Sequence, residues 1–91
     1  AVVKSGMKPK ELAAPFDTVT ICLSKGLGCP IGALLIFDKQ HYDTVRRLKQ
    51  LFGGALRQSG ILAAAGLYAL EHNINRLEEE VTRFSNRFYV E

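Results

Sequence analysis

The sequence is short of the residues that build disulfide frameworks, metal sites and membrane spans. Its only cysteines, Cys22 and Cys29, are not spaced as C-x-x-C, and no cluster of Cys and His surrounds them. We therefore predict no metal site, reduced thiols and a cytoplasmic protein, because disulfides concentrate in secreted chains. The longest apolar stretches, such as 61–70, are shorter than the ~20 residues of a membrane-spanning helix, so we predict no membrane association.

The chain also lacks a strong excess of either charge, since it has 12 basic and 9 acidic residues and a formal net charge of +3. Surface aromatics do not interleave with the basic residues, so a solvated basic face is favoured over nucleic-acid binding. The 91 residues suit one small domain with a modest core. Because the chain begins without an initiator methionine, we expect an internal fragment of a longer protein.

Two short segments predict adjacent β-strands. Over 18–24, β-branched and apolar residues alternate with polar ones, which is the period of a strand. Over 31–37 the run is almost wholly apolar, as in a strand that is buried on both faces. The connection between them is short, so we expect the two strands to pair in antiparallel fashion.

Two helices are predicted to follow the strands. Asp38 is a suitable N-cap for a helix over 39–52, which the glycines at 53 and 54 end. A long helix is predicted over 59–88, with a small, apolar and buried first half and an amphipathic second half. Apolar residues spaced alternately by three and four form a seam along it: Leu67, Leu70, Ile74, Leu77, Val81, Phe84 and Phe88. Such a seam must pack against another surface.

The chemically unusual residue is Lys25, which lies between Ser24 and Gly26 where the first strand ends. Desolvation there would favour a neutral, nucleophilic amine that can form an imine with an aldehyde. Gly26 and Gly28 would let the backbone turn and would leave space for a flat cofactor. Strand position alone favours the plainer interpretation, a lysine that merely flanks a strand and reaches solvent.

Two motifs resemble those of threonine aldolases, which use pyridoxal 5'-phosphate (PLP). The first is Ser-Lys-Gly-Leu-Gly at 24–28, followed by Pro-Ile-Gly-Ala-Leu-Leu at 30–35. The second is Gly-Gly-Ala-Leu-Arg-Gln-Ser-Gly-Ile-Leu-Ala-Ala-Ala-Gly-Leu-Tyr-Ala-Leu at 53–70. Their order and separation also fit the family, over roughly residues 16–80. Ala55 is a mild departure, because the family often has a third glycine there.

The resemblance implies an α/β fold of the aspartate-aminotransferase type. Residues 1–91 would be a fragment of its PLP-binding large domain, with the helix over 59–88 leading toward a small domain outside this chain. Lys25 would hold PLP as a Schiff base, and Arg57 would bind the cofactor phosphate from a neighbouring subunit. The parent would be a carbon–carbon lyase and a homotetramer, and it would cleave L-threonine or L-allo-threonine to glycine and acetaldehyde. The fragment alone is expected to be inactive.

Several other residues have plainer interpretations. We expect His41 and His72 at the surface, Tyr68 in the core, and both cysteines as small packing residues. Ser59 is interpreted as a helix cap, and Ser24 is a secondary candidate for contact with the phosphate or the lysine.

Two alternative functions stay open at this point. Another PLP enzyme of the same fold, such as a glycine hydroxymethyltransferase or a β-eliminating lyase, would share Lys25 but would not be expected to carry the Arg57-Gln58-Ser59-Gly60 helix start. A non-enzymatic oligomerisation helix would use the apolar seam, but it leaves the glycine pattern around Lys25 unexplained. The residues present do not decide between L-threonine and L-allo-threonine.

Overall fold

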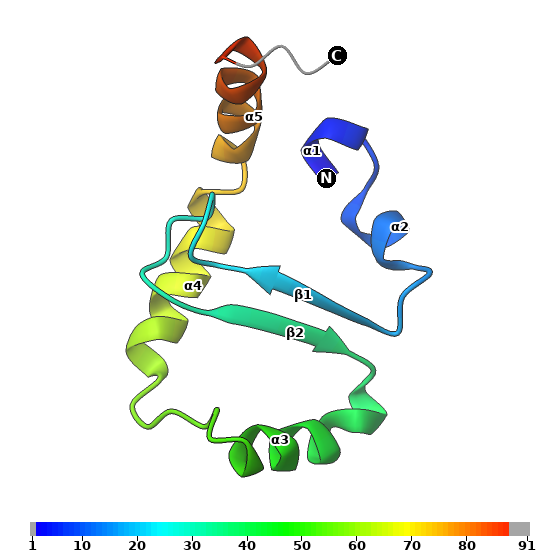
Figure 1. The fold of residues 1–91 in the computed structure, drawn as a ribbon, viewed down its shortest axis with the longest axis vertical. Helices are drawn as coiled ribbons and strands as arrows, with labels where there is room; N and C mark the ends of the chain where they lie inside the picture. Colours follow the sequence, from blue (N-terminus) through cyan, green and yellow to red (C-terminus); the bar gives the residue numbers. More distant parts are fainter. Residues whose placement is uncertain (1, 88–91) are drawn as a thin grey trace.

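The computed structural model describes the backbone of residues 2–87 and the side chains of residues 2–82. Figure 1 shows a hairpin of two strands bordered by helices. In chain order the elements are α1 (Val2–Ser5), α2 (Pro9–Ala13), β1 (Thr18–Cys22), β2 (Ala33–Phe37), a 3-10 turn (Lys39–His41), α3 (Tyr42–Leu51), α4 (Gly60–His72) and α5 (Arg76–Arg87). The α/β class predicted from the sequence is confirmed. The predicted seam positions Phe84 and Phe88 lie outside the side chains described.

The two strands pair as predicted. They run antiparallel, with Thr18 opposite Phe37 and Ile21 opposite Leu34. Each strand is two residues shorter than predicted, because the chain leaves the ladder at Leu23 and rejoins it after Gly32. One further bond, from the Leu23 N–H to the Gly32 carbonyl at 2.9 Å, closes the base of the connecting loop.

The helix predicted over 39–52 is also confirmed. The Asp38 carboxylate accepts a hydrogen bond from the Gln40 N–H at 2.9 Å, and the first turn is a 3-10 turn before α3 begins. At the other end Gly53 takes a left-handed φ of 74°. The N–H groups of Gly53 and Gly54 then reach back to the carbonyls of Gln50 and Lys49, which is how glycine ends a helix.

The single long helix predicted over 59–88 is wrong, because the chain breaks between α4 and α5 at residues 73–75 (Figure 1). The Asn73 N–H closes α4 on the Ala69 carbonyl at 2.8 Å, and the Arg76 N–H starts α5 on the Asn73 carbonyl at 3.1 Å. Asn73, Ile74 and Asn75 are all weak helix formers. The Asn73 side chain also bonds the Leu27 carbonyl, so tertiary contact adds to weak local preference.

The core lies where the loop after β1 meets α4. Four hydrophobic residues are buried there, Leu23, Leu27, Cys29 and Ala69, with Ile21, Leu70 and Leu77 packed around them. Small residues make this contact possible. Ala69 is only 1% exposed, and a Cβ added to the buried Gly66 would lie 3.3 Å from the Leu23 side chain.

Burial of the first half of α4 is confirmed on one face only. Ile61 is 78% exposed and Leu67 is 70% exposed, although both belong to the apolar stretch. The predicted burial of 31–37 on both faces is likewise not met within this chain. Leu34, Leu35 and Ile36 of β2 are exposed, because the described helices leave the two-stranded sheet open. None of the helices in the described part is both long and apolar enough to cross a membrane.

We expect Ala69→Leu to lower the free energy of unfolding by about 1–3 kcal/mol, because added methyl groups overpack a filled site. Urea denaturation of the purified protein measures this change. Ala64→Leu is the matched control, since Ala64 is exposed on the same helix and its substitution should stay within about 0.5 kcal/mol of the parent. Equal effects at the two positions would mean that the loop does not lie on α4.

Candidate active site

Lys25 lies in the loop after β1, on backbone that is anchored on both sides. The Gly28 N–H bonds the Lys25 carbonyl at 2.8 Å and closes a tight turn, for which Gly28 takes a φ of 76°. The side chains of Leu23 and Leu27 are buried against α4 and its neighbours. The Lys25 side chain itself is exposed. A fixed backbone therefore carries a freely accessible amine.

The amine of Lys25 has neither a carboxylate nor a hydrogen-bond partner among the side chains of residues 2–82. The desolvation predicted for it is not met in this single chain, because the loop presents the side chain to solvent. Any exclusion of water from the amine must therefore come from groups beyond these residues.

The two glycines beside Lys25 serve different purposes. Gly28 provides the turn, as predicted. The prediction that Gly26 leaves space for a flat cofactor is wrong in this structure. A Cβ at Gly26 would lie 2.5 Å from Leu77 Cδ2 and 2.8 Å from Glu80 Oε2, so side chains of α5 already fill that space. The glycine is needed there for the close approach of α5.

Arg57 lies in the connection between α3 and α4, and its side chain is exposed. The next residue, Gln58, has a φ of 50°, which is the left-handed region that side chains other than glycine seldom adopt. Ser59 stands at the N-cap position of α4, as predicted, but its side chain makes no capping hydrogen bond. Its backbone carbonyl instead accepts the Ala63 N–H at 2.9 Å. Residue type gives no signal of the Gln58 conformation, and sequence reasoning missed it.

The loop after β1, which carries Lys25, and the connection between α3 and α4, which carries Arg57, lie near opposite ends of α4 (Figure 1). The Lys25 loop contacts Asn73 just beyond the last turn, whereas Arg57 precedes the first turn at Gly60. A helix of 13 residues is about 20 Å long. The single chain therefore does not bring the amine and the guanidinium into contact.

The chemistry of these two groups nevertheless fits PLP. A primary amine is the group that combines with the cofactor aldehyde, and a guanidinium makes charge-assisted bonds to a phosphate. Within the described side chains neither group is engaged by another residue. Both are thus available to a ligand, and Lys25 is available from a backbone position that is fixed.

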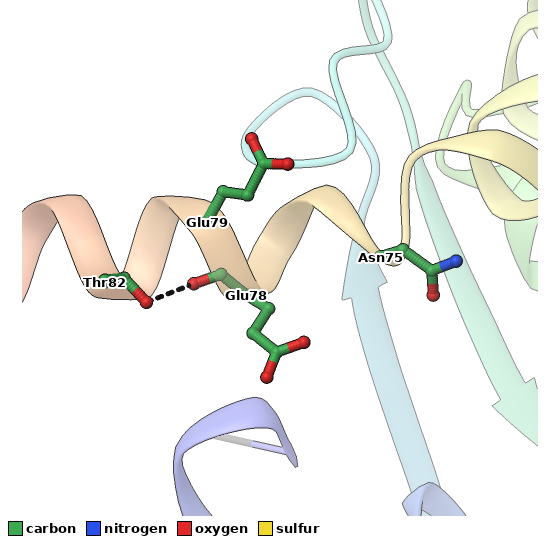
Figure 2. Close-up of a pocket in the computed structure, with 4 residues that line it drawn as sticks. All are labelled: Asn75, Glu78, Glu79 and Thr82. Carbon is green, nitrogen blue, oxygen red and sulfur yellow. Dashed lines mark hydrogen bonds between the residues drawn. The ribbon is translucent and has the colours of Figure 1, made fainter.

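A hollow beside α5 differs from the surroundings of Lys25 and Arg57 because two acidic residues line it. Asn75, Glu78, Glu79 and Thr82 line it (Figure 2), and the Thr82 hydroxyl donates to the Glu78 carbonyl at 2.9 Å. Two carboxylates disfavour a phosphate by like-charge repulsion. The hollow includes neither Lys25 nor Arg57, so it is not the cofactor site.

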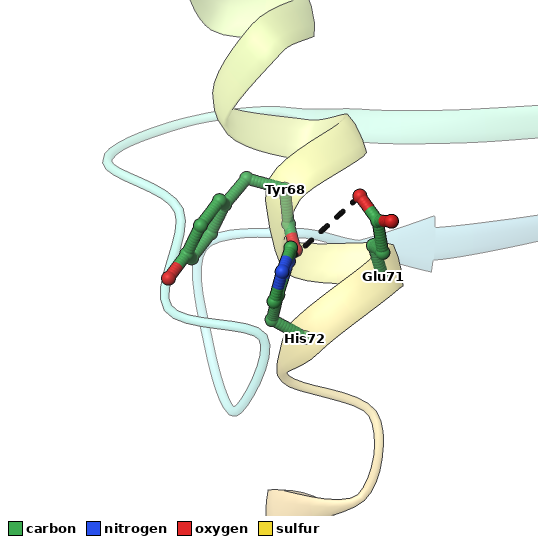
Figure 3. Close-up of polar contacts among 3 residues, drawn as sticks. All are labelled: Tyr68, Glu71 and His72. Carbon is green, nitrogen blue, oxygen red and sulfur yellow. Dashed lines mark hydrogen bonds and ion pairs between the residues drawn. The ribbon is translucent and has the colours of Figure 1, made fainter.

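The histidines are surface residues, as predicted. The His72 ring stacks on Tyr68 with centroids 4.2 Å apart, and its Nδ1 lies 3.0 Å from the Tyr68 carbonyl and 3.9 Å from Glu71 (Figure 3). Tyr68 is 61% exposed, so its predicted place in the core is wrong. Its ring lies along the surface of α4 beside His72.

The two cysteines lie in different environments, and only one of them fits the predicted packing role. Cys29 is buried and its thiol lies 3.5 Å from the Ala65 carbonyl, which confirms a packing role, whereas Cys22 is exposed. Ser24 is exposed as well, and its role in binding phosphate stays a prediction.

Comparison with known proteins connects this geometry to one family. The beta-eliminating lyase family matches residues 1–88. The low specificity L-threonine aldolase of Escherichia coli O157:H7 is 51% identical over 80 residues, which are 88% of this chain and 24% of that protein. A probable low-specificity L-threonine aldolase of Schizosaccharomyces pombe is 42% identical over 79 residues, covering 87% of this chain and 21% of that protein.

A third relative, the low-specificity L-threonine aldolase of Candida albicans, is 40% identical over 78 residues, or 86% of this chain and 21% of that protein. The chain thus spans about a quarter of the length of the curated relatives it matches. The resemblance seen in the two sequence motifs is confirmed.

The strained backbone at Gln58 gives a test of the helix start beside Arg57. We expect Gln58→Gly to raise the free energy of unfolding by up to about 1 kcal/mol, because glycine adopts a left-handed φ without steric cost. Gln50→Gly, within α3, should lower it by about 1 kcal/mol, since there glycine only loosens a helix. Both are read by urea denaturation. Destabilisation of similar size at both positions would contradict a left-handed Gln58.

Proposed function

Since this chain belongs to the beta-eliminating lyase family, we propose that the full-length protein is a PLP-dependent threonine aldolase. It would cleave L-threonine or L-allo-threonine to glycine and acetaldehyde. One observation carries the proposal: Lys25 presents an accessible, uncommitted amine from an anchored loop, within a segment that is 51% identical to an L-threonine aldolase. This chain alone, which carries only part of such an enzyme, is proposed to be inactive.

In this proposal Lys25 holds the cofactor covalently through its side-chain amine. When bound, PLP supplies the electron sink that lets the Cα–Cβ bond of a β-hydroxy-α-amino acid break. The protein's own contribution is to hold the Lys25 amine in position. The turn closed by the Gly28 N–H fixes the Lys25 backbone, so the amine sweeps a limited volume. Placement of this kind lowers the entropy lost when reacting groups meet.

Arg57 is proposed to bind the cofactor phosphate of a neighbouring subunit. Its forked donors suit a phosphate better than a lysine would. The position of Arg57 at the end of α4 away from the Lys25 loop supports a site that two chains share. The full-length protein would then be a homo-oligomer, and we propose a tetramer.

The exposed apolar surface supports the place of this chain within a larger domain. Leu34, Leu35 and Ile36 of β2 are exposed, as is Phe52 after α3. Exposed apolar area on this scale marks a surface that another part of the protein covers. We therefore propose that residues 1–91 form part of the PLP-binding large domain, and that α5 leads toward a small domain.

The proposed compartment is the cytoplasm. Cys22 and Cys29 are both free thiols in the structure, and a reducing compartment keeps thiols in that state. Neither nucleic acid nor membrane has a part in the proposed function. Its ligands are the cofactor and an amino acid.

Beta elimination is the second candidate reaction, because the family description names it. The relatives at 40–51% identity are named as threonine aldolases, and this favours aldol cleavage. The products separate the two reactions: cleavage of threonine yields glycine and an aldehyde, whereas elimination yields a keto acid and ammonia.

The attachment residue can be identified directly. Borohydride treatment of the full-length protein with PLP should fix the cofactor on Lys25, and peptide mass mapping should locate it there. Lys25→Ala should lose this label and lower kcat for threonine cleavage by about 10³-fold or more, since the attachment group is removed. Lys39→Ala, which removes another exposed lysine, should leave both readouts unchanged. A label on any other lysine would end the assignment.

A shared site can be tested by mixing two inactive variants. Subunits carrying Lys25→Ala and subunits carrying Arg57→Ala should regain up to about a quarter of the parent activity after joint unfolding and refolding, because random pairing rebuilds some intact sites. The two variants refolded separately are the control. If Lys25 and Arg57 serve the same site of one chain, every site in the mixture lacks one group and activity does not return.

A further inference from the structure

One side chain joins the Lys25 loop to the helices across a long stretch of sequence. The Asn73 side-chain amide donates to the Leu27 carbonyl at 2.8 Å, over a separation of 46 residues. Leu27 is two positions after Lys25, inside the turn that the Gly28 N–H closes on the Lys25 carbonyl. The bond therefore acts on the Leu27–Gly28 peptide unit, whose N–H closes the turn of the lysine.

The loop has few other directional ties to the helices. Its remaining backbone bonds, from Cys29 to Leu23 and from Leu23 to Gly32, stay within the hairpin connection. The Cys29 thiol lies 3.5 Å from the Ala65 carbonyl, but a thiol is a weak donor. Burial of the leucines holds the loop down without fixing its orientation, because hydrophobic contact is not directional. The Asn73 side-chain amide provides a directional hydrogen bond from the helices to the loop.

Asn73 is itself held in place. Its N–H bonds the Ala69 carbonyl at 2.8 Å and its carbonyl accepts the Arg76 N–H at 3.1 Å, so both helices fix its backbone. Ala69 is the most deeply buried residue of the core. A donor on such a support has little freedom left to lose when it forms a bond.

Gly28 lies against the same amide. A Cβ at Gly28 would be 3.6 Å from Asn73 Nδ2, so the loop and the junction between α4 and α5 are in close contact at two successive residues. Asn73 thus touches the loop at the Leu27 carbonyl and beside the glycine that makes the turn. The hydrogen-bond partner of its side-chain amide is the Leu27 carbonyl and not the Lys25 side chain, which is exposed.

We propose that Asn73 is a positioning residue for Lys25: its amide fixes the turn at residues 25–28, and so confines the region that the lysine amine reaches. This inference rests on the proposed function, because it assigns Asn73 a purpose in the chemistry of Lys25. The break between α4 and α5 is then part of the site, since an uninterrupted helix would not present this amide to the loop.

The test uses full-length protein with PLP bound and the variant Asn73→Asp, which keeps the size of the side chain but removes its donor. We expect kcat for threonine cleavage to fall about 10–100-fold, because small displacements of a reacting group are costly. KM should change much less. The matched control is Asn75→Asp, which makes the same change two residues away at an exposed position of the junction and should leave kcat at the parent value.

Hydrogen exchange separates positioning from general loss of stability. In Asn73→Asp the amides of Gly28 and Cys29 should exchange about five- to tenfold faster, which corresponds to the loss of one hydrogen bond. The Ala63 amide, in the first turn of α4, should keep its rate. Equal acceleration at all three amides would assign Asn73 a structural role only, and would overturn the proposal.

A second variant covers the case in which Asn73→Asp does not fold. Asn73→Ser introduces no charge, and its shorter hydroxyl does not reach the Leu27 carbonyl, so the same fall in kcat and the same local exchange are expected. Parent kcat in either folded variant would overturn the positioning proposal while leaving Lys25 labelling intact. Absence of the borohydride label from Lys25 in the parent protein would instead overturn the proposed function, whatever Asn73 does.

Discussion

The loop after β1 can lie on α4 only because α4 offers it small residues. Gly66 and Ala69 form the floor on which Leu23 and Leu27 pack, and the Leu23 side chain lies 3.3 Å from where a Cβ of Gly66 would be. The placement of the Lys25 loop follows from this contact. It sets the height of the loop above the helix, and therefore where the turn at residues 25–28 stands relative to Asn73.

The same contact explains how the loop can be held on α4 while the Lys25 side chain stays exposed. Burial of the leucines holds the loop on α4, while the Lys25 side chain stays exposed and has no partner among the described side chains. A long, flexible side chain on a fixed base can reach a ligand without being trapped by a neighbouring carboxylate. The described residues therefore account for placement of the amine. They do not desolvate it, so in the proposed function the desolvation would come from the cofactor, from further chain or from a partner subunit.

What the sequence predicted well is what depends on local pattern. The alternation over 18–24, the Asp38 cap and the glycines after α3 each act through neighbours in the chain, and the structure confirms all three. What it predicted poorly depends on contacts across the chain. The apolar spacing continues through residues 73–75, so periodicity hid the break that Asn73 makes in order to reach Leu27.

The other errors have the same origin. Gly26 was assigned to cofactor space because sequence cannot show that α5 folds back against it. Tyr68 and β2 were assigned to a core because apolar character does not say how much of that core a given chain contains. The motif around Lys25 was located correctly, since the spacing of residues along a loop survives whatever packs on it. The functional roles of Lys25 and Arg57 stay predictions.

The two faces of α4 differ in how far the rest of the described chain covers them. One face is small and covered by the Lys25 loop, whereas Ile61 and Leu67 leave an apolar surface open elsewhere on the helix. A helix that is apolar all round is normally buried all round. The uncovered surface begins at the end of α4 where the connection with Arg57 joins it, so whatever covers Ile61 lies near that connection. If a second subunit covers it, one contact both buries the helix and brings Arg57 to a site that its own Lys25 does not share.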